Sequence, residues 1–264
     1  MKILVTVKEV AEVEDEFEIT DGEIDERYLE YDLNEWDNYA IEEAVQISEE
    51  HNGVEVVTAT IGPERAEETI RMALAKGADR AIRLWDDTLE RAEFLDTDTK
   101  ADLLAAVVED EDPDLVLTGV QSGDEANSAT GVMLAEKIGY QWGAVVNDLS
   151  LDIDGGVASV HRELEGGVEE MTDIETPAVL TIQSGINEPR YASLRGIRQA
   201  QKKPLAVETL EDLGVEPGVV ESPLAQTSLY EPESDGDATM LSGDPDEEAA
   251  QIADILRDKG VVDA

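Results

Sequence analysis

Cysteine is absent from the 264-residue sequence, and there are only two histidines, His51 and His161. The lack of cysteine excludes disulfide bonds and thiol chemistry. The two histidines are far apart in the chain and form no H-E-x-x-H motif, so a transition-metal site or a Ser-His triad lacks its usual residues. Carboxylates are too numerous for any pair to indicate acid/base catalysis, and we expect no catalytic residue.

Basic residues are also scarce, with 19 Lys and Arg against 64 Asp and Glu and a formal net charge of −45. Nucleic acids and anionic membranes require a positive footprint, so neither is expected as a partner. The acidic residues are spread over every segment, which is typical of a solvated surface. Since salt screens the repulsion among them, our hypothesis is a halophilic host with a salt-loaded cytosol.

Long apolar runs are missing as well, and no stretch approaches the ~20 residues of a membrane span. The opening MKILVTVKEV is too short for a signal peptide, so we expect a cytoplasmic protein without direct membrane insertion. Hydrophobic residues make up 41% of the chain, which is ordinary for a globular protein and argues against disorder.

Strand-like and helix-like segments alternate through the first half of the chain. Apolar runs at 2–7, 54–61, 81–85 and 114–119 alternate with amphipathic stretches at 37–49, 63–77 and 101–110. This order predicts a Rossmann-like α/β fold, with a doubly wound, mostly parallel sheet. The acidic segment before residue 33 is expected to be a loop or a weak hairpin.

The second half predicts an appended hairpin at 157–174, with its turn at Glu165-Gly166-Gly167, and a buried strand at 178–183. From 208 to 246 Pro, Gly and Ser recur without periodicity, which indicates an extended arm, and 247–260 is a short amphipathic helix. We therefore expect an α/β domain at 1–207, and at 208–264 an arm and helix that pack on a partner subunit. A disordered tail is the alternative.

The best nucleotide-binding candidate is GVQSGDEANSATG, residues 119–131, directly after the strand at 114–119. Ligands of open α/β sheets bind beyond the carboxyl ends of strands, and Gly119 and Gly123 permit a close approach of the backbone. Asn127, Ser128 and Thr130 supply uncharged donors, and the following helix presents free N–H groups to a phosphate. The alternative is a helix N-cap without a ligand. Neither a G-x-G-x-x-G fingerprint nor a P-loop is present.

A second candidate is DLNEW, residues 32–36, where Asn34 can cap a helix and Trp36 can be a core aromatic or cover an adenine. Thr6 is an ordinary strand residue unless these loops converge on it. In a parallel sheet the ends of the first and fourth strands can meet, which gives one pocket lined by three segments.

One basic segment stands out on this acidic chain: residues 189–207 contain no Asp or Glu but carry five cations. Tyr191, Leu194 and Ile197 lie among these cations, which include Arg195. Exposed apolar groups rimmed by charge indicate a docking site. The alternative is a loop whose cations pair with the acidic surface.

Four motifs resemble the β subunit of electron transfer flavoproteins, the FixA family. They are ILVTVKEV at the start, NEPRYASL at 187–194, VHRELEGGVEE with TPAVLTI at 160–182, and the G-x-Q…T-G loop at 119–131. The resemblance covers residues 1 to about 210. It implies a non-catalytic half of a heterodimer with an α subunit that holds most of a redox-active FAD. Electrons would pass from flavin dehydrogenases to a quinone oxidoreductase.

The resemblance also implies an adenine nucleotide, usually AMP, in this subunit, and a docking surface. The recognition loop, 186–204, would insert Leu194 into a dehydrogenase with Arg190 and Tyr191 beside it, and Glu163 would pair with a basic residue of the α subunit. By motif match the nucleotide site falls on Thr6, Asn34, Glu35, Trp36, Asp37, Ile61, Gly119, Val120, Gln121, Ser122, Gly123, Asp124, Glu125, Ala126, Asn127, Ser128, Ala129 and Thr130.

The nucleotide loop departs from the family pattern, since Ala126 and Ala129 match neither the AMP type nor the bifurcating type, whose β subunit binds a second FAD. Glu35 also replaces a common proline. AMP and FAD therefore both stay open. A rival from another class is a stand-alone, universal-stress-like protein that binds ATP as a homodimer, and a nucleotide hydrolase ranks last because no P-loop or metal cluster is present.

Overall fold

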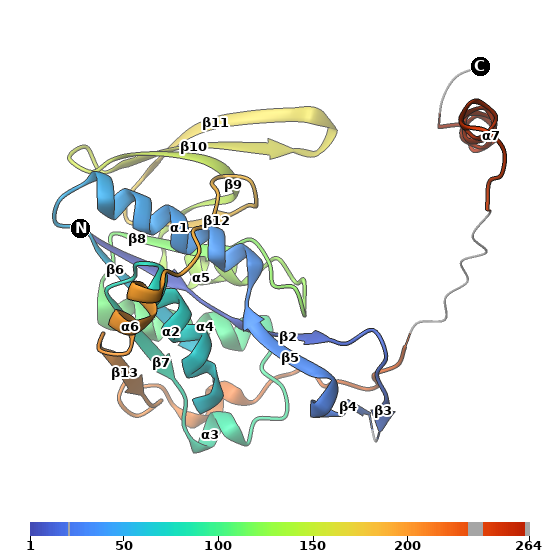
Figure 1. Ribbon diagram of the computed structural model, residues 1–264. Helices are drawn as coiled ribbons and strands as arrows, with labels where there is room; N and C mark the ends of the chain where they lie inside the picture. The colour runs from blue at the N-terminus through green and yellow to red at the C-terminus, as the bar shows by residue number, and fades with distance from the viewer. Residues whose placement is uncertain (21, 232–239, 262–264) are drawn as a thin grey trace. The chain divides into compact units, whose positions relative to one another are not determined.

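The computed structural model describes residues 1–20, 22–231 and 240–261 (Figure 1). The chain divides into two compact units, Met1–Ser228 and Leu229–Ala264. The larger unit is the predicted Rossmann-like α/β fold, in which a mostly parallel sheet lies between two layers of helices. Of the predicted arm, residues 232–239 lie outside the described residues.

The central sheet has the strand order β11-β10-β9-β12-β8-β1-β6-β7-β13. The first strand, β1, is parallel to both of its neighbours, β6 and β8, and the sheet is extended in parallel by β7 and β13 on one side and β12 on the other. Strands buried on both faces read as continuous apolar runs, which is why they were visible in the sequence. The bounds are β1 Lys2–Thr6, β6 Glu55–Ile61, β7 Arg80–Leu84, β8 Leu115–Gly119, β12 Ala178–Ile182 and β13 Leu205–Glu208.

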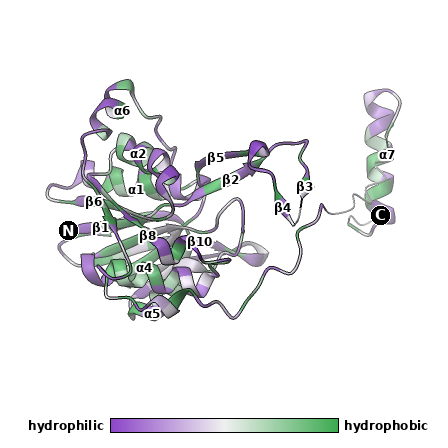
Figure 2. Ribbon diagram, turned by 90° about the horizontal axis from the view of Figure 1, so that it is seen from below, coloured by the Kyte–Doolittle hydropathy of each residue, from purple (hydrophilic) through white to green (hydrophobic). Residues whose placement is uncertain are grey.

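Helices cover both faces of this sheet, as Figure 2 shows, with α1, α2 and α6 on one side of β1, β6 and β8 and with α4 and α5 on the other. The predicted helices are confirmed, whereas α3 and α6 were not expected. Single helical turns are η1 Glu26–Tyr28, η2 Glu64–Ala66, η3 Glu165–Gly167 and η4 Pro217–Val220. The helices are α1 Glu35–Glu50, α2 Glu67–Lys76, α3 Asp87–Glu90, α4 Thr97–Glu111, α5 Thr130–Ile138 and α6 Leu194–Ala200.

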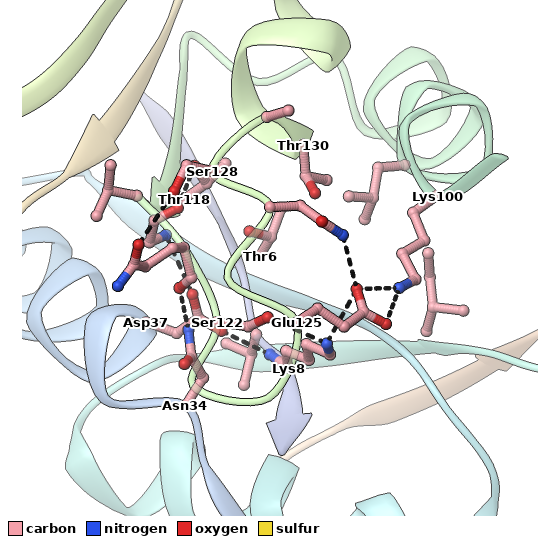
Figure 3. A pocket seen from close by; sticks show the side chains of 18 of the residues that line it. Thr6, Lys8, Asn34, Asp37, Lys100, Thr118, Ser122, Glu125, Ser128 and Thr130 are labelled. Atoms are coloured by element: carbon pink, nitrogen blue, oxygen red, sulfur yellow. Dashed lines mark hydrogen bonds and ion pairs between the residues drawn. The ribbon is translucent and has the colours of Figure 1, made fainter. Parts of the chain in front are cut away.

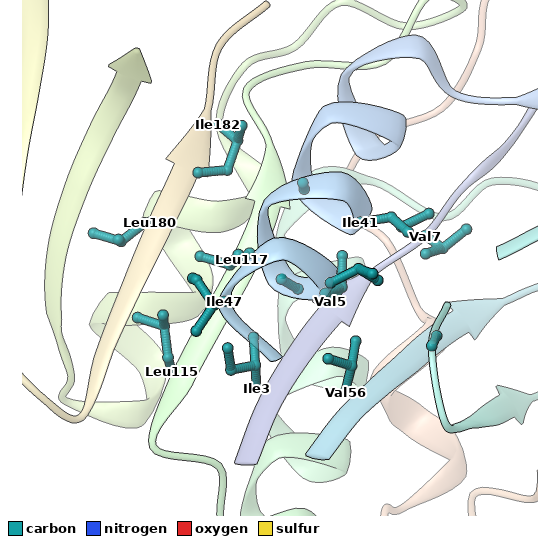
Figure 4. Packing of buried hydrophobic residues seen from close by; sticks show 14 of the residues in the cluster. Ile3, Val5, Val7, Ile41, Ile47, Val56, Leu115, Leu117, Leu180 and Ile182 are labelled. Atoms are coloured by element: carbon teal, nitrogen blue, oxygen red, sulfur yellow. The ribbon is translucent and has the colours of Figure 1, made fainter. Parts of the chain in front are cut away.

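The two cores meet at β1, because successive side chains of a strand point to opposite faces. Ile3 and Val5 pack under α1, where Ile41 and its neighbours form the predicted apolar stripe (Figure 4). Leu4 points to the other core, beneath α4 and α5. Each of these fully buried side chains stabilises the fold by roughly 1.5–3 kcal/mol, so the sheet is a firm support for the loops at its edge.

The predicted hairpin is confirmed as β10 Val157–Leu164 and β11 Val168–Glu175, which are antiparallel and continue from β9 Gln141–Asp152. Its turn contains Gly166 and Gly167 at φ values of 76° and 73°, a region that glycine adopts without strain. The acidic segment before residue 33 forms hairpins. Strand β2 Glu9–Val13 pairs with β5 Leu29–Leu33, and β3 Ile19–Thr20 pairs with β4 Glu23–Ile24.

The first part of the predicted arm belongs to the larger unit. Leu210 is buried, and Leu213, Val215 and Val219 pack against the core below α4. The boundary between the two compact units falls after Ser228, and apolar contacts together with the hydrogen bond from Ser222 to Asp96 fix this otherwise irregular segment.

The smaller unit contains α7 Pro245–Asp258, which confirms the predicted terminal helix. Asp244 and Glu247 cap it reciprocally in a capping box. Within the described part of the chain, none of the helices has the length and apolar character needed to span a membrane.

Candidate functional site

A cavity opens at the carboxyl ends of β1, β6 and β8 (Figure 3). The chain runs outward from β1 to β6 and β7 in one direction and to β8 in the other, so this is the topological switch point where open α/β sheets bind ligands. The space between the lining residues is about 800 Å³, a volume that includes the solvent at its open side. The end of β1, the start of α1 and the loop after β8 meet here, as the sequence analysis expected.

Most of the predicted nucleotide-site residues line this cavity. Glu35, Trp36, Gly123, Asp124 and Ala126 do not. Trp36 instead donates its Nε1–H to Oε1 of Gln183 at 3.2 Å, so the structure does not place its ring over the cavity. The lining residues from the prediction are Thr6, Asn34, Asp37, Ile61, Gly119, Val120, Gln121, Ser122, Glu125, Asn127, Ser128, Ala129 and Thr130.

Asn34 and Asp37 hold the three segments together. Asn34 donates to the carbonyl of Gln121 at 2.9 Å and accepts from the N–H of Gly123 at 3.2 Å, so its side chain holds the loop and does not cap α1. Asp37 accepts from the N–H of Lys8 at 2.7 Å and from that of Gly119 at 3.1 Å. Both side chains are buried, and their polar atoms are used in shaping the site.

The carboxyl group of Asp37 has little contact with solvent, since the residue is only 5% exposed. Burial raises the pKa of Asp37 to about 7, although the N–H donors of Lys8 and Gly119 act in the opposite direction. The charge state of this buried acid therefore changes near neutral pH.

Gly119 is required by close packing and not by its backbone conformation. A Cβ atom there would lie 2.7 Å from the Cβ of Trp36 and in contact with the carboxyl group of Asp37. By contrast, a Cβ atom at Gly123 would meet nothing within 4 Å. The close approach of α1 to the end of β8 therefore requires glycine at position 119 but not at position 123.

The loop after β8 carries backbone strain at two non-glycine residues. Ala126 and Ser128 each have a φ of 52°, in the left-handed region that disfavours residues with a Cβ. Strain of this kind, roughly 1–3 kcal/mol per residue, persists where surrounding contacts over-determine the backbone, and it is concentrated at ligand sites.

Two lysines at the cavity were missed by the sequence analysis. Lys8 follows β1 and pairs with Asp124 at 2.7 Å, and Lys100 on α4 pairs with Glu125 at 2.6 Å. Lys8 is part of the V-K in the opening motif and could have been named from it. No sequence pattern places Lys100 at the loop, since 25 positions separate it from Glu125. Among the described residues, no group of His, Asp and Glu side chains forms a metal site.

The basic segment forms an exposed surface around the start of α6. Tyr191 is 97% exposed, Leu194 78% and Ile197 40%. Arg195 is exposed beside them. Three apolar side chains thus face solvent next to cations, as predicted, and α6 gives the segment a helical end that the sequence analysis did not include.

Two cations of this segment, Arg190 and Lys203, are held by contacts within the chain. The guanidinium of Arg190 forms a fork with the carboxylates of Glu42 and Glu49 on α1, at distances of 2.7–3.0 Å. Lys203 is also used internally, since its Nζ donates to carbonyls at the end of α2. The role of Arg190 in docking stays a prediction, and in the structure its side chain also secures the loop.

Asn187 provides a second attachment to α1, donating to the carbonyl of Tyr39 at 3.1 Å and to Glu43 at 3.0 Å. The same helix therefore holds the nucleotide loop at its start and the basic segment along its length. Glu163, the remaining predicted partner residue, is exposed on β10 opposite Glu169 of β11.

Comparisons with known proteins agree on one family. Residues 21–213 match the electron transfer flavoprotein domain. The chain is 46% identical over 264 residues to the electron transfer flavoprotein subunit beta of Methylophilus methylotrophus, with 98% of each chain covered. It is 33% identical to the subunit beta of Bacillus subtilis strain 168, covering 99% and 100%, and 33% identical to the mitochondrial subunit beta of Arabidopsis thaliana, covering 92% and 94%.

Proposed function

Because the chain belongs to the electron transfer flavoprotein family as a β subunit, we propose that it is the non-catalytic half of a heterodimeric electron carrier. Its partner is the α subunit, which holds most of a redox-active FAD. The complex carries electrons from flavin dehydrogenases to a quinone oxidoreductase in the cytoplasm. Membership in this family argues against the stand-alone stress-protein hypothesis.

We propose that the cavity at the switch point holds AMP in a structural role. The support is its position at the switch point, its uncharged donors and the start of α5, which no side chain caps. A buried adenylate would tie β1, α1 and α5 together without taking part in electron transfer. Mass spectrometry of the nucleotide released from the purified α–β complex tests this: AMP supports it, whereas FAD indicates the bifurcating type.

The docking of dehydrogenases is assigned to the exposed side chains around the start of α6, with Leu194 as the anchor. The observation that carries this is a leucine left 78% exposed on a segment that α1 holds firmly through Arg190 and Asn187. A pre-ordered loop binds without a large entropy cost, and a buried leucine contributes roughly 1.5–3 kcal/mol.

Leu194→Ala is expected to leave the flavin content and the chemical reduction of the α–β complex unchanged. Reduction by the dehydrogenase is followed by flavin absorbance. The concentration of the α–β complex that gives the half-maximal rate should rise by roughly 10- to 150-fold. Val207→Ala, an exposed apolar residue on β13, is the matched control. An unchanged rate in the Leu194 variant would exclude this residue as the anchor.

The α subunit would be contacted through the hairpin and the C-terminal region. Glu163 is proposed to pair with a basic residue of the flavin-holding part of α, because it is exposed near the end of β10. The same role is proposed for the unit that contains α7, whose amphipathic helix leaves Ile252 and Ile255 exposed.

A further inference from the structure

The carboxylate of Glu125 lies among several cationic and polar donors at the rim of the cavity (Figure 3). Nζ of Lys100 is 2.6 Å from both of its oxygens. Nζ of Lys8 and Nδ2 of Asn127 are each 3.5 Å from Oε2. A planar anion is thus held by two lysines and an amide, which is a donor set suited to a phosphate.

The charges of this rim are already balanced before any ligand is considered. Lys8 and Lys100 face Asp124 and Glu125. A nucleotide monophosphate brings about 1.5 to 2 further negative charges at pH 7. Such a ligand would meet like charge here unless one carboxylate moved away.

Of the two carboxylates, Glu125 is the one free to leave. Asp124 accepts from Nζ of Lys8 at 2.7 Å and from the N–H of Glu125 at 2.8 Å, so it is part of the loop's own structure. The longer side chain of Glu125 is held only through its end, by the three donors described above. Rotation of this side chain would release Lys100 and Asn127 without unfolding the loop.

The start of α5 lies on the same cavity and favours an anion. Thr130 and Ala129 line the cavity, no side chain caps the helix, and its first turn has no acidic residue. The N–H groups and the dipole of a helix start stabilise negative charge. Lys100, Asn127 and the start of α5 therefore line the same cavity, in which a phosphate can be bound.

We propose that Glu125 holds the place of the nucleotide phosphate, and that AMP binds by displacing this carboxylate from Lys100. The proposal rests on the proposed binding of AMP in this cavity. It makes Lys100 a phosphate-binding residue and Glu125 an internal competitor that weakens nucleotide affinity.

The test measures the dissociation constants of AMP and adenosine for the intact α–β complex, by equilibrium dialysis with labelled AMP and competition by adenosine. E125Q is expected to tighten AMP binding about fivefold, which corresponds to about 1 kcal/mol for a partly exposed charge pair. Adenosine has no phosphate, so its dissociation constant should change less than about twofold. The control is E109Q, which removes one negative charge from an exposed glutamate near the end of α4.

A double-mutant cycle with Lys100 separates competition from general repulsion. K100M should weaken AMP about fivefold, and in this background E125Q should give almost no gain, because the competed donor is gone. Unchanged or weaker AMP binding by E125Q, or an equal gain with adenosine, overturns the proposal even though the proposed nucleotide site stands. A wild-type complex that binds neither probe and releases no nucleotide overturns both.

Discussion

Substitution of Arg190 by alanine should loosen the basic segment from α1. The residue donates five hydrogen bonds to Glu42 and Glu49, four from the guanidinium and one from its backbone N–H. Lys76 reinforces the same turn by donating to the carbonyl of Arg190 at 2.6 Å. No other side chain described in this segment connects it to two carboxylates at once.

The magnitude depends on the burial of Glu42, whose side chain is only 6% exposed. Burial acts to raise the pKa of Glu42, but the hydrogen bonds from Arg190 outweigh this and lower the pKa below its usual value. Without Arg190, a buried carboxylate is left with Gln46 as its remaining side-chain donor. A buried charged group that loses its partner costs about 2 kcal/mol, reduced here because Glu49 remains in water.

Hydrogen exchange of the α–β complex measures this effect locally. A loss of about 2 kcal/mol should raise the exchange rate of amides in 187–197 about 30-fold, while amides of β1 and β8 keep their rates. Arg198→Ala, an exposed cation on α6, is the matched control and should change exchange little.

A second substitution, at Glu42, tests whether the unpaired carboxylate causes the effect. Glu42→Gln combined with Arg190→Ala removes the orphaned charge, so the double variant should exchange more slowly than Arg190→Ala alone. If Arg190→Ala behaves like Arg198→Ala, the fork does not order the loop. In that case the rigidity of the docking surface must come from Asn187 and α6.

Three further outcomes are expected. Because the pKa of Asp37 is about 7 in the folded chain against 3.8 as the ordinary value, stability should fall as pH rises from about 4 to 7, by about 4 kcal/mol from this group. The stability of Asp37→Asn relative to wild type should therefore rise over that range, and a constant difference in Tm would contradict it. Gly119→Ala should destabilise the fold by about 1–3 kcal/mol in denaturant unfolding, whereas Gly123→Ala should have little effect; equal effects would exclude the packing argument. Molar KCl should raise the Tm by screening a net charge of −45, and an unchanged or lower Tm would argue against a salt-loaded host.

Several elements could be predicted because their signals are local. Buried parallel strands such as β1 and β8 are continuous apolar runs, and the Gly-Gly turn marks the hairpin β10–β11. The loop after β8 could be predicted to lie at the sheet edge, since it follows a strand and precedes a helix, and most of its residues line the cavity, whereas Gly123, Asp124 and Ala126 do not. The helix α6 and the strand β13 were not predicted, because they are short and depend on packing against α2 and β7.

The roles of charged residues required the folded chain. Arg190 and Leu194 lie in one motif, yet the structure makes the first an internal anchor and leaves the second exposed. Trp36 was a candidate to cover an adenine, but its indole points to Gln183. The buried residues of the arm, such as Leu210, have no periodic pattern by which the sequence could reveal their packing.

The sequence by itself determined the family, the α/β architecture and the two segments on which function is proposed to depend. Each of these depends on patterns of residues that are close together in the chain. Only the tertiary structure decided which groups face the cavity, that Lys100 and Glu125 meet there, and that α1 supports both surfaces. The physical reason is distance along the chain. Hydrophobic patterning acts over a few residues, whereas an ion pair or a buried hydrogen bond joins positions that only the fold brings within 3 Å or so of each other.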